Sequence, residues 1–301
     1  MGAGRTLFPP ELVVQVKSLA CQLPSELGVP LSRFSQRELQ RYLVERGLVA
    51  TISHRTIWRW LSEDALRPWN RRSWVFPRDP EFAAKAGRVL DLYAGEWEGK
   101  PLGPREFVVS ADEKTQLQIR RRIHPVEPPG PGRAMRVEHE YKRLGTCAYL
   151  AAWDVHEACL FGRIVDAARI DTFDPFVAEV MATEPYRSAE RVFWVVDNGT
   201  IHRGQRSIDR LEGRWPNLRL IHLPVHASWL NQIEIYFSIL TRKALTPDHF
   251  GSHHELEGRV LGFQTHYQQV AQPFEWKFTR ADLLRVLVHL NDTELPTAVA
   301  A

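Results

Sequence analysis

The spacing of apolar positions predicts helices in the first part of the chain. Residues 9–22 follow a helical period behind a pair of prolines that suits a helix start. A second helix begins after Ser35, because Ser35 and Glu38 stand three residues apart as a capping box. Ser53 caps a third helix after a short turn. Residues 35–66 therefore have the pattern of a helix-turn-helix.

The third helix carries polar and basic residues where a recognition helix meets DNA. Its first turns hold side chains that such a helix presents to base edges in the major groove. Residues 67–80 then have the pattern of an extended basic linker with interleaved tryptophans, which suits a phosphate backbone. A helical hairpin with solvated arginines and a simple surface connector remain alternatives. The candidate DNA-binding residues are His54, Arg55, Thr56, Arg59, Arg67, Arg71 and Arg72.

From about residue 100 the pattern changes to short apolar strands separated by helices. The first two strands are expected to pair with each other as a hairpin. The order of the elements predicts an α/β domain, a mixed sheet flanked by helices. We divide the chain into residues 1–66 (helix-turn-helix region), 67–100 (basic linker and helix) and 101–301 (α/β domain). Strands are predicted at 107–112, 117–124, 145–155, 157–166, 191–199 and 217–224, and helices at 81–97, 171–185, 205–215, 227–245 and 281–292.

Charge and composition narrow the classes of protein. Residues 1–75 hold 11 Lys and Arg against 6 Asp and Glu, whereas the whole chain has a net charge of +3. A basic first region favours a nucleic-acid-binding module. The chain is 44% hydrophobic and 25% charged, which excludes a largely disordered protein. No apolar run reaches the ~18–20 residues of a membrane span. Three widely spaced cysteines argue against a disulfide framework or a zinc ribbon and favour a reducing compartment.

Three acidic residues of the second region are candidates for metal-dependent chemistry. Asp112 and Asp197 end predicted strands, and Glu234 lies at the edge of the buried face of the predicted helix 227–245. Carboxylates that converge on one point repel each other, and a divalent cation removes that conflict. Two such ions form the clamp used in phosphodiester displacement. Other interpretations stay open, because Asp-Asn-Gly is also a turn signal and Glu113 could serve in place of Asp112.

Polar residues beside these acids could support them. Asn198 and His202 follow Asp197 and could contact phosphate or orient water, although His202 also fits a surface loop. Asn231, one turn before Glu234, could orient that carboxylate through a hydrogen bond.

A proline-rich segment within residues 120–143 concentrates positive charge. We expect this loop to contact a DNA backbone or a second subunit, with a solvated flap as the alternative. His253 and His254 are expected in another surface loop. The cations of the proline-rich segment are Arg120, Arg121, Arg122, Arg133, Arg136, Lys142 and Arg143, against Glu127, Glu138 and Glu140.

Three sequence blocks resemble the DDE transposases of bacterial insertion sequences. The blocks are SADEKT at 110–115, VVDNGTIH at 195–202 and HASWLNQIEIYFSIL at 226–240. The similarity is to the insertion sequence 630 type within the mariner-like DDE superfamily. It extends from the helix-turn-helix to about residue 290, with VEHEYKRLGT at 137–146 and FEWKFTRADL at 274–283 also similar.

The resemblance implies a ribonuclease-H-like fold for residues 101–301, preceded by an all-α helix-turn-helix region. It places the family's catalytic and metal-binding acids on Asp112, Asp197 and Glu234. The implied activity is binding of terminal inverted repeats, DNA strand cleavage and strand transfer into target DNA, with two Mg²⁺ ions or Mn²⁺ as a substitute. The implied state is a homodimer on double-stranded DNA in the bacterial cytoplasm, associated with the nucleoid and with no membrane partner.

Two alternatives to an active transposase follow from the same residues. A decayed or repurposed copy would bind DNA without cutting it. A nuclease acting on RNA–DNA hybrids is disfavoured, because helix-turn-helix modules read duplex DNA in its major groove. Members of the family often carry two helix-turn-helix units, and only about 30 residues precede Ser35, so we expect an N-terminally trimmed copy.

Overall fold

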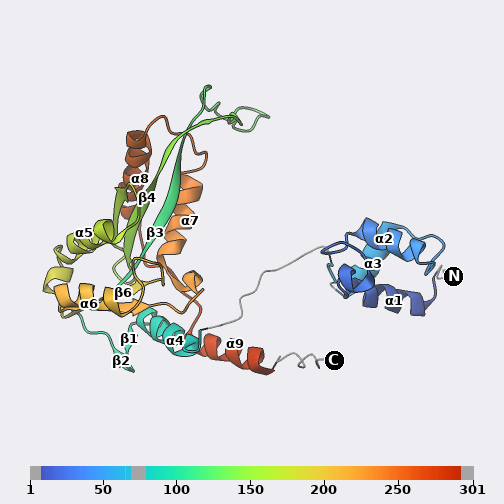
Figure 1. Ribbon diagram of the computed structural model, residues 1–301, viewed down its shortest axis with the longest axis horizontal. Coiled ribbons are helices and arrows are strands. Elements are labelled where there is room, and N and C mark those ends of the chain that lie inside the picture. The colour runs from blue at the N-terminus through green and yellow to red at the C-terminus, as the bar shows by residue number, and fades with distance from the viewer. Residues whose placement is uncertain (1–7, 65, 69–78, 293–301) are drawn as a thin grey trace. The chain divides into compact units, whose positions relative to one another are not determined.

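The computed structural model describes residues 8–64, 66–68 and 79–292, and the chain forms two compact units, Met1–Phe76 and Pro77–Ala301. Asp197 and the other candidate acids belong to the second unit, while the candidate DNA-binding residues belong to the first. Figure 1 shows the elements of both units. No helix in the described ranges has the length and apolar character needed to cross a membrane.

The first unit is a small bundle of helices around an apolar core. The predicted caps are confirmed, because the Ser35 Oγ accepts the Glu38 N–H at 3.2 Å and the Ser53 Oγ accepts the Thr56 N–H at 3.0 Å. Glu38 accepts the Ser35 N–H in return, which completes the capping box. The helices are α1 (Pro10–Ala20), α2 (Gln36–Glu45) and α3 (His54–Glu63), with a 3₁₀ turn η1 (Pro24–Leu27), and Val16, Leu39, Leu43, Ile57 and Leu61 are fully buried between them.

The second unit is built on a mixed sheet, as the strand pattern predicts. Its order is β5-β4-β3-β6-β7, with β3 parallel to β6 and β6 parallel to β7, while β4 runs antiparallel to both β3 and β5. A separate pair, β1 (Glu96–Trp97) and β2 (Lys100–Pro101), lies beside it. The main strands are β3 (Glu106–Arg121), β4 (Lys142–Asp154), β5 (Leu160–Val165), β6 (Arg191–Val196) and β7 (Leu218–His222).

Helices cover both faces of this sheet, so its central strands are continuous apolar runs (Figure 1). In β6, Phe193 and Val195 belong to the core shared with α4 and α7, whereas Trp194 and Val196 belong to the core shared with α5 and α6. The helices are α4 (Phe82–Tyr93), α5 (Ile170–Met181), α6 (Gln205–Arg214), α7 (Ile233–Lys243), α8 (His253–Gln268) and α9 (Arg280–Asp292), with 3₁₀ turns η2 (Tyr186–Ser188) and η3 (Ser228–Leu230).

The predicted hairpin between residues 107–112 and 117–124 is wrong. The first segment and residues 117–121 of the second belong to the single 16-residue strand β3, whose pairing with β4 shifts register between Lys114 and Leu117. Gln116 takes a φ of +55° at this irregularity. The polar break in the sequence marks a bulge and not a turn, so Asp112 lies within a strand and not at its end.

The predicted helix 227–245 is also divided. Asn231 takes an extended conformation after η3, and α7 begins only at Ile233. The side chain of Ser110 accounts for the break, because its Oγ accepts the Ile233 N–H at 2.9 Å and its hydroxyl donates to Asn231 Oδ1. The expected loop around His253 is wrong as well, since α8 starts there behind the cap Ser252.

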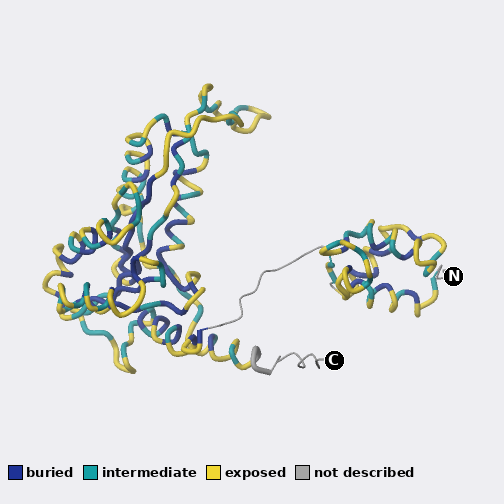
Figure 2. The backbone as a smooth tube through the Cα atoms, viewed as in Figure 1, coloured by how far each residue is buried: buried dark blue, intermediate teal, exposed yellow. Residues whose placement is uncertain are grey.

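Beyond the bulge, β3 and β4 continue into an arm, residues 117–146, which is buried at its base, at Leu117 and Ile119, and mostly exposed further out (Figures 1 and 2). Several of the arm's cations already have partners inside the protein. Arg120 and Arg122 both pair with Asp248, and the guanidinium groups of these two residues lie over the ring of Tyr141. Arg133 and Arg136 lie 3.5 Å from the carboxylate of Glu127. Contact of the arm with DNA or a second subunit stays a prediction.

Candidate active site

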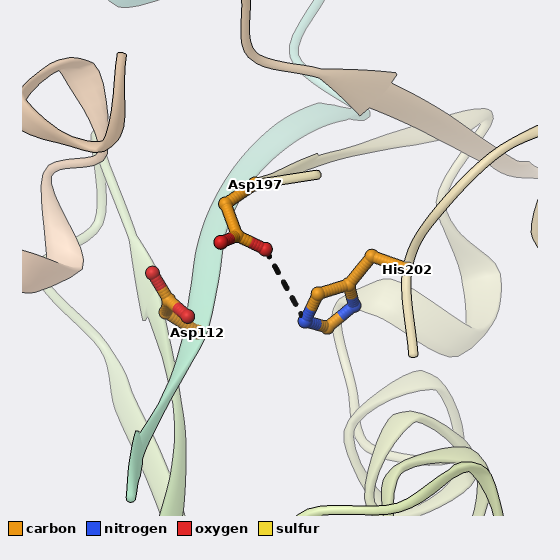
Figure 3. Close-up of side chains that lie close together, drawn as sticks. All are labelled: Asp112, Asp197 and His202. Atoms are coloured by element: carbon orange, nitrogen blue, oxygen red, sulfur yellow. Dashed lines mark ion pairs between the residues drawn. The ribbon is translucent and has the colours of Figure 1, made fainter. Parts of the chain in front are cut away.

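The register between β3 and β6 brings Asp112 and Asp197 to the same level of the sheet. Ser110 pairs with Val195 in these parallel strands, and each aspartate lies two residues further along its own strand direction. Side chains two residues apart in a strand share a face, and Asp197 follows β6 directly. One ligand atom each from Asp112, Asp197 and His202 lies within 4.8 Å of the others. Figure 3 shows the three side chains converging.

Asp112 is a buried carboxylate with a strongly raised pKa. Its side chain is 7% exposed and accepts hydrogen bonds from Asn231 Nδ2 at 3.0 Å and from the Glu113 N–H at 2.8 Å. Burial, together with the negative charges of Asp197, Glu113 and Glu234, raises the pKa of Asp112 to about 8. The hydrogen bonds thus leave most of the electrostatic cost of an ionised Asp112 uncompensated.

Asp197 opens a tight loop that its own carboxylate closes. Its Oδ1 accepts the Gly199 N–H at 2.7 Å, and a Cβ at position 199 would lie 2.8 Å from the same oxygen. Asn198 donates from Nδ2 to the Leu223 carbonyl, so its amide ties this loop to the segment after β7. The turn interpretation of Asp-Asn-Gly and the convergence of Asp197 on Asp112 are therefore both correct.

Glu234 lies in the first turn of α7, exposed and outside the group of three. Desolvation raises the pKa of its carboxyl group, Lys114 lowers it, and the charge of Asp197 raises it again. Glu234 in turn contributes to the raised pKa of Asp112. The structure thus brings Asp112 and Asp197 together and leaves Glu234 beside them.

His202 is fully buried, so the interpretation as a surface-loop histidine is wrong. Its Nε2 lies 2.9 Å from Glu113 Oε2 and 3.9 Å from Asp197 Oδ1, and its ring meets Phe173 edge-on at 4.5 Å. Glu113 faces His202 because neighbouring residues of a strand point to opposite sides, which places it across β3 from the side chain of Asp112.

Asn231 orients Asp112 and not Glu234, contrary to the sequence-based expectation. It is 1% exposed, and its Nδ2 donates to both Asp112 Oδ2 and the Ala111 carbonyl. The expectation assumed a continuous helix, which the extended backbone at Asn231 breaks. Sequence reasoning missed Ser110, although its position two residues before Asp112 on the same strand face is a usable signal.

The candidate DNA-binding residues lie on the outer side of α3 and just after it. His54, Arg55, Arg59 and Arg67 are exposed, whereas Thr56 is half-buried with its Oγ1 2.9 Å from Ser53 Oγ. Trp58 is 48% exposed among them, and the sequence pattern gave no reason to expect it there. Arg71 and Arg72, with most of the predicted basic linker, lie outside the described residues.

Comparisons with known proteins agree with this geometry. Two solved structures similar to the chain are the "Mos1 transposase paired-end complex with left transposon end" and the "Mos1 Strand Transfer Complex". The first is 14% identical over 90% of this chain and 76% of that chain, the second 13% identical over 90% and 75%, and both have a TM-score of 0.53. At such identity the likeness establishes the ribonuclease-H-like fold. A search of curated proteins found no match.

The sequence also matches one protein family directly. Residues 108–257 match the profile described as "DDE superfamily endonuclease". This range runs from β3 to the start of α8 and includes Asp112, Asp197 and Glu234. The chain therefore contains a DDE superfamily endonuclease domain.

Proposed function

We propose that the protein is a DDE transposase that binds terminal inverted repeats and cleaves and transfers DNA strands at Asp112, Asp197 and Glu234. The observation that carries the proposal is the convergence of Asp112 and Asp197 across parallel strands, with burial and like charge raising the pKa of Asp112 to about 8. A site that holds carboxylates at such a cost is typical of a functional centre.

The donor set fits a divalent cation such as Mg²⁺ or Mn²⁺. Asp112 and Asp197 offer hard oxygen ligands, and Glu234 would complete the set from α7. When bound, two such ions polarise a phosphodiester and activate the attacking water or hydroxyl group. We propose that the three carboxylates hold two divalent cations and not one.

The chain's own side chains orient these ligands. Asn231 holds one oxygen of Asp112 and the Glu113 N–H holds the other, so the carboxylate keeps a single orientation. His202 lies beside Asp197 with its Nε2 2.9 Å from Glu113 Oε2. These partners restrict the ligands as supporting hydrogen bonds do in metal sites.

DNA recognition is assigned to the first unit within this proposal. The exposed cations of α3 suit contacts in a major groove, and the titles of the similar Mos1 structures name a transposon end and a strand transfer complex. A homodimer, terminal repeats bracketing the gene and kinship with the insertion sequence 630 type of bacteria belong to the same proposal.

The test replaces Asp112 with asparagine, which keeps the shape and removes the charge. With Mg²⁺ and an inverted-repeat duplex taken from the DNA that flanks the gene, Asp112→Asn should reduce nicking more than about 10³-fold and leave DNA binding unchanged. Asp171→Asn is the matched control, since Asp171 is exposed in the first turn of α5. Wild-type nicking by Asp112→Asn would refute the proposal.

DNA binding without cleavage is the second candidate function. The exposed position of Glu234 outside the group of three favours it. The wild-type protein decides between the two in the same assay, because a binding protein would retain the duplex without nicking it in Mg²⁺ or Mn²⁺.

A further inference from the structure

The segment between β7 and α7 is anchored by buried residues yet presents one large aromatic side chain to solvent. Trp229 is 48% exposed, while Ala227, Leu230 and Asn231 on either side of it are at most 1% exposed. The indole packs edge-on against Phe278 with ring centroids 5.6 Å apart, which restricts its motion. An exposed tryptophan held still by a second ring has the features of a contact surface.

Hydrogen bonds from three side chains distant in the sequence hold the backbone around Trp229. Tyr93 of α4 donates from its hydroxyl to the Leu230 carbonyl at 2.8 Å. Asp79 accepts the Val225 N–H at 3.1 Å, and Asn198 donates to the Leu223 carbonyl. These hydrogen bonds hold residues 223–231 in one conformation, and we call them the Trp229 segment.

The backbone of the Trp229 segment also contains a strained residue. His226 is exposed and takes a φ of +62°, a conformation that residues other than glycine rarely adopt. Such strain persists only where the surroundings enforce it, and it gathers at binding and catalytic sites.

The Trp229 segment is connected to Asp112 through Asn231. Trp229 stands two residues before Asn231, a separation of at most about 7 Å along the chain. The amide of Asn231 is 3.0 Å from Asp112 Oδ2. Trp229 and Asp112 are therefore joined through a single residue, Asn231, whose backbone lies next to the tryptophan and whose side chain contacts the carboxylate.

We propose that Trp229 stacks on a nucleobase adjacent to the phosphodiester bound at the carboxylates. The inference rests on the proposed function, because it takes DNA as the molecule at Asp112. A nucleobase fits better than a second protein chain, since the indole stands next to exposed polar residues, Ser228 and His226, and not within a broad apolar face. Base–aromatic stacking is tolerant of sequence, which suits positioning of a strand end.

The experiment uses photo-cross-linking, which reports position and not activity. The probe is a duplex of about four helical turns with the inverted repeat found beside the gene, carrying 5-iododeoxyuridine at one position at a time near its end. Full-length Asp112→Asn protein holds the duplex without turnover, and mass spectrometry locates the cross-link. We expect it on the peptide that contains Trp229.

Variants at the same position give the quantitative readout. In the Asp112→Asn background, Trp229→Ala should lower the cross-link yield about tenfold and Trp229→Phe should retain most of it. In the wild-type background, Trp229→Ala should slow nicking about tenfold without weakening overall DNA affinity. Val270→Ala is the matched control, because Val270 is a 68% exposed apolar residue just after α8.

The possible failures are distinguishable. If Asp112→Asn nicks DNA at the wild-type rate, the proposed function fails, whatever the cross-link shows. If Asp112→Asn is inactive and bound but no cross-link maps to Trp229, the stacking contact alone is overturned. The stacking contact is also overturned if Trp229→Ala leaves the cross-link intact and changes the sedimentation from dimer to monomer, since a second copy would then cover the indole.

Discussion

The two units of this protein place their polar functional groups in opposite ways. Within the described residues, every buried polar or charged side chain lies in Pro77–Ala301, among them Ser110, Asp112, His202 and Asn231. The core of the first unit is entirely apolar, and its candidate DNA-binding side chains stand on the outer side of α3. Exposed cations need no internal partners, whereas buried carboxylates do.

This contrast predicts how each unit responds to substitution. In the first unit, binding residues can change without disturbing the fold, because they contribute little to packing. In the second unit, the residues that organise the site also satisfy one another's hydrogen bonds, so function and stability change together. The three substitutions below are ordered by decreasing effect on stability.

The largest effect is expected from Asn231→Ala. It removes one donor from the buried Asp112 carboxylate and the acceptor of the buried Ser110 hydroxyl, which should lower the free energy of unfolding by about 3 kcal/mol. Nicking should fall as well, because Asp112 loses its fixed orientation. Urea denaturation and the nicking assay measure both effects.

Asn217→Ala is the matched control for this prediction. Asn217 also donates to two internal carbonyls, those of Tyr186 and Ala189, but lies away from the carboxylates. It should lose stability and keep its nicking rate per folded molecule. Equal nicking by both variants would contradict the orienting role of Asn231.

A smaller effect, of opposite sign, is expected from Asp112→Asn in the absence of divalent cations. The pKa of Asp112 is raised from its ordinary value of 3.8 to about 8 in the folded protein. Between these pH values the folded chain holds a proton that the unfolded chain has released, so wild-type stability falls as the pH rises through this window. The variant escapes this loss, and its advantage should grow from about pH 4 and level off above about pH 8.

Thermal melting in EDTA checks the prediction about Asp112. At about pH 8 we expect the variant to melt about 4 °C higher, which corresponds to about 1 kcal/mol for a unit of this size. Mg²⁺ should raise the melting temperature of the wild type and not that of the variant. A variant that melts lower than the wild type under these conditions would argue against the electrostatic cost assigned to this site.

The smallest effect on stability is expected from Arg59→Ala. Arg59 is exposed on α3, so the melting temperature should stay the same. DNA affinity should fall about tenfold at low salt. The slope of the logarithm of affinity against the logarithm of salt concentration should become less steep by about one, because one phosphate contact is lost. Fluorescence anisotropy across a salt series measures both quantities. A marked loss of stability would break the contrast between the two units.

The comparison of the units also explains what the sequence could predict. The caps of α2 and α3 were predictable because Ser35, Glu38 and Ser53 act on backbone groups within three residues. The aspartates were recognisable from motifs next to apolar strands. The break before α7 was not predictable, because it depends on Ser110, which is 123 residues distant from Ile233.

The same limit applies to the finer geometry of the site. The pairing of His202 with Glu113 joins residues 89 positions apart, and no periodicity in the sequence indicates it. The bulge after Lys114 looks like a turn in the sequence, because polar residues interrupt the apolar pattern in both cases. Tertiary hydrogen bonds and strand register decided these features, while the local pattern predicted the elements themselves.

The bulge in β3 changes the direction of the strand just after Asp112. One strand carries Asp112 at the candidate site and then continues into the arm, with the interrupted pairing between Lys114 and Leu117 separating the two portions. A bulge at such a point bends the strand and increases its local twist. Leu117 and Ile119, just past the bulge, stay buried in the core shared with α7, so the strand is held on both sides of the bend. The bulge therefore sets the direction in which β3 leaves the candidate site, and the packing on both sides keeps that direction fixed.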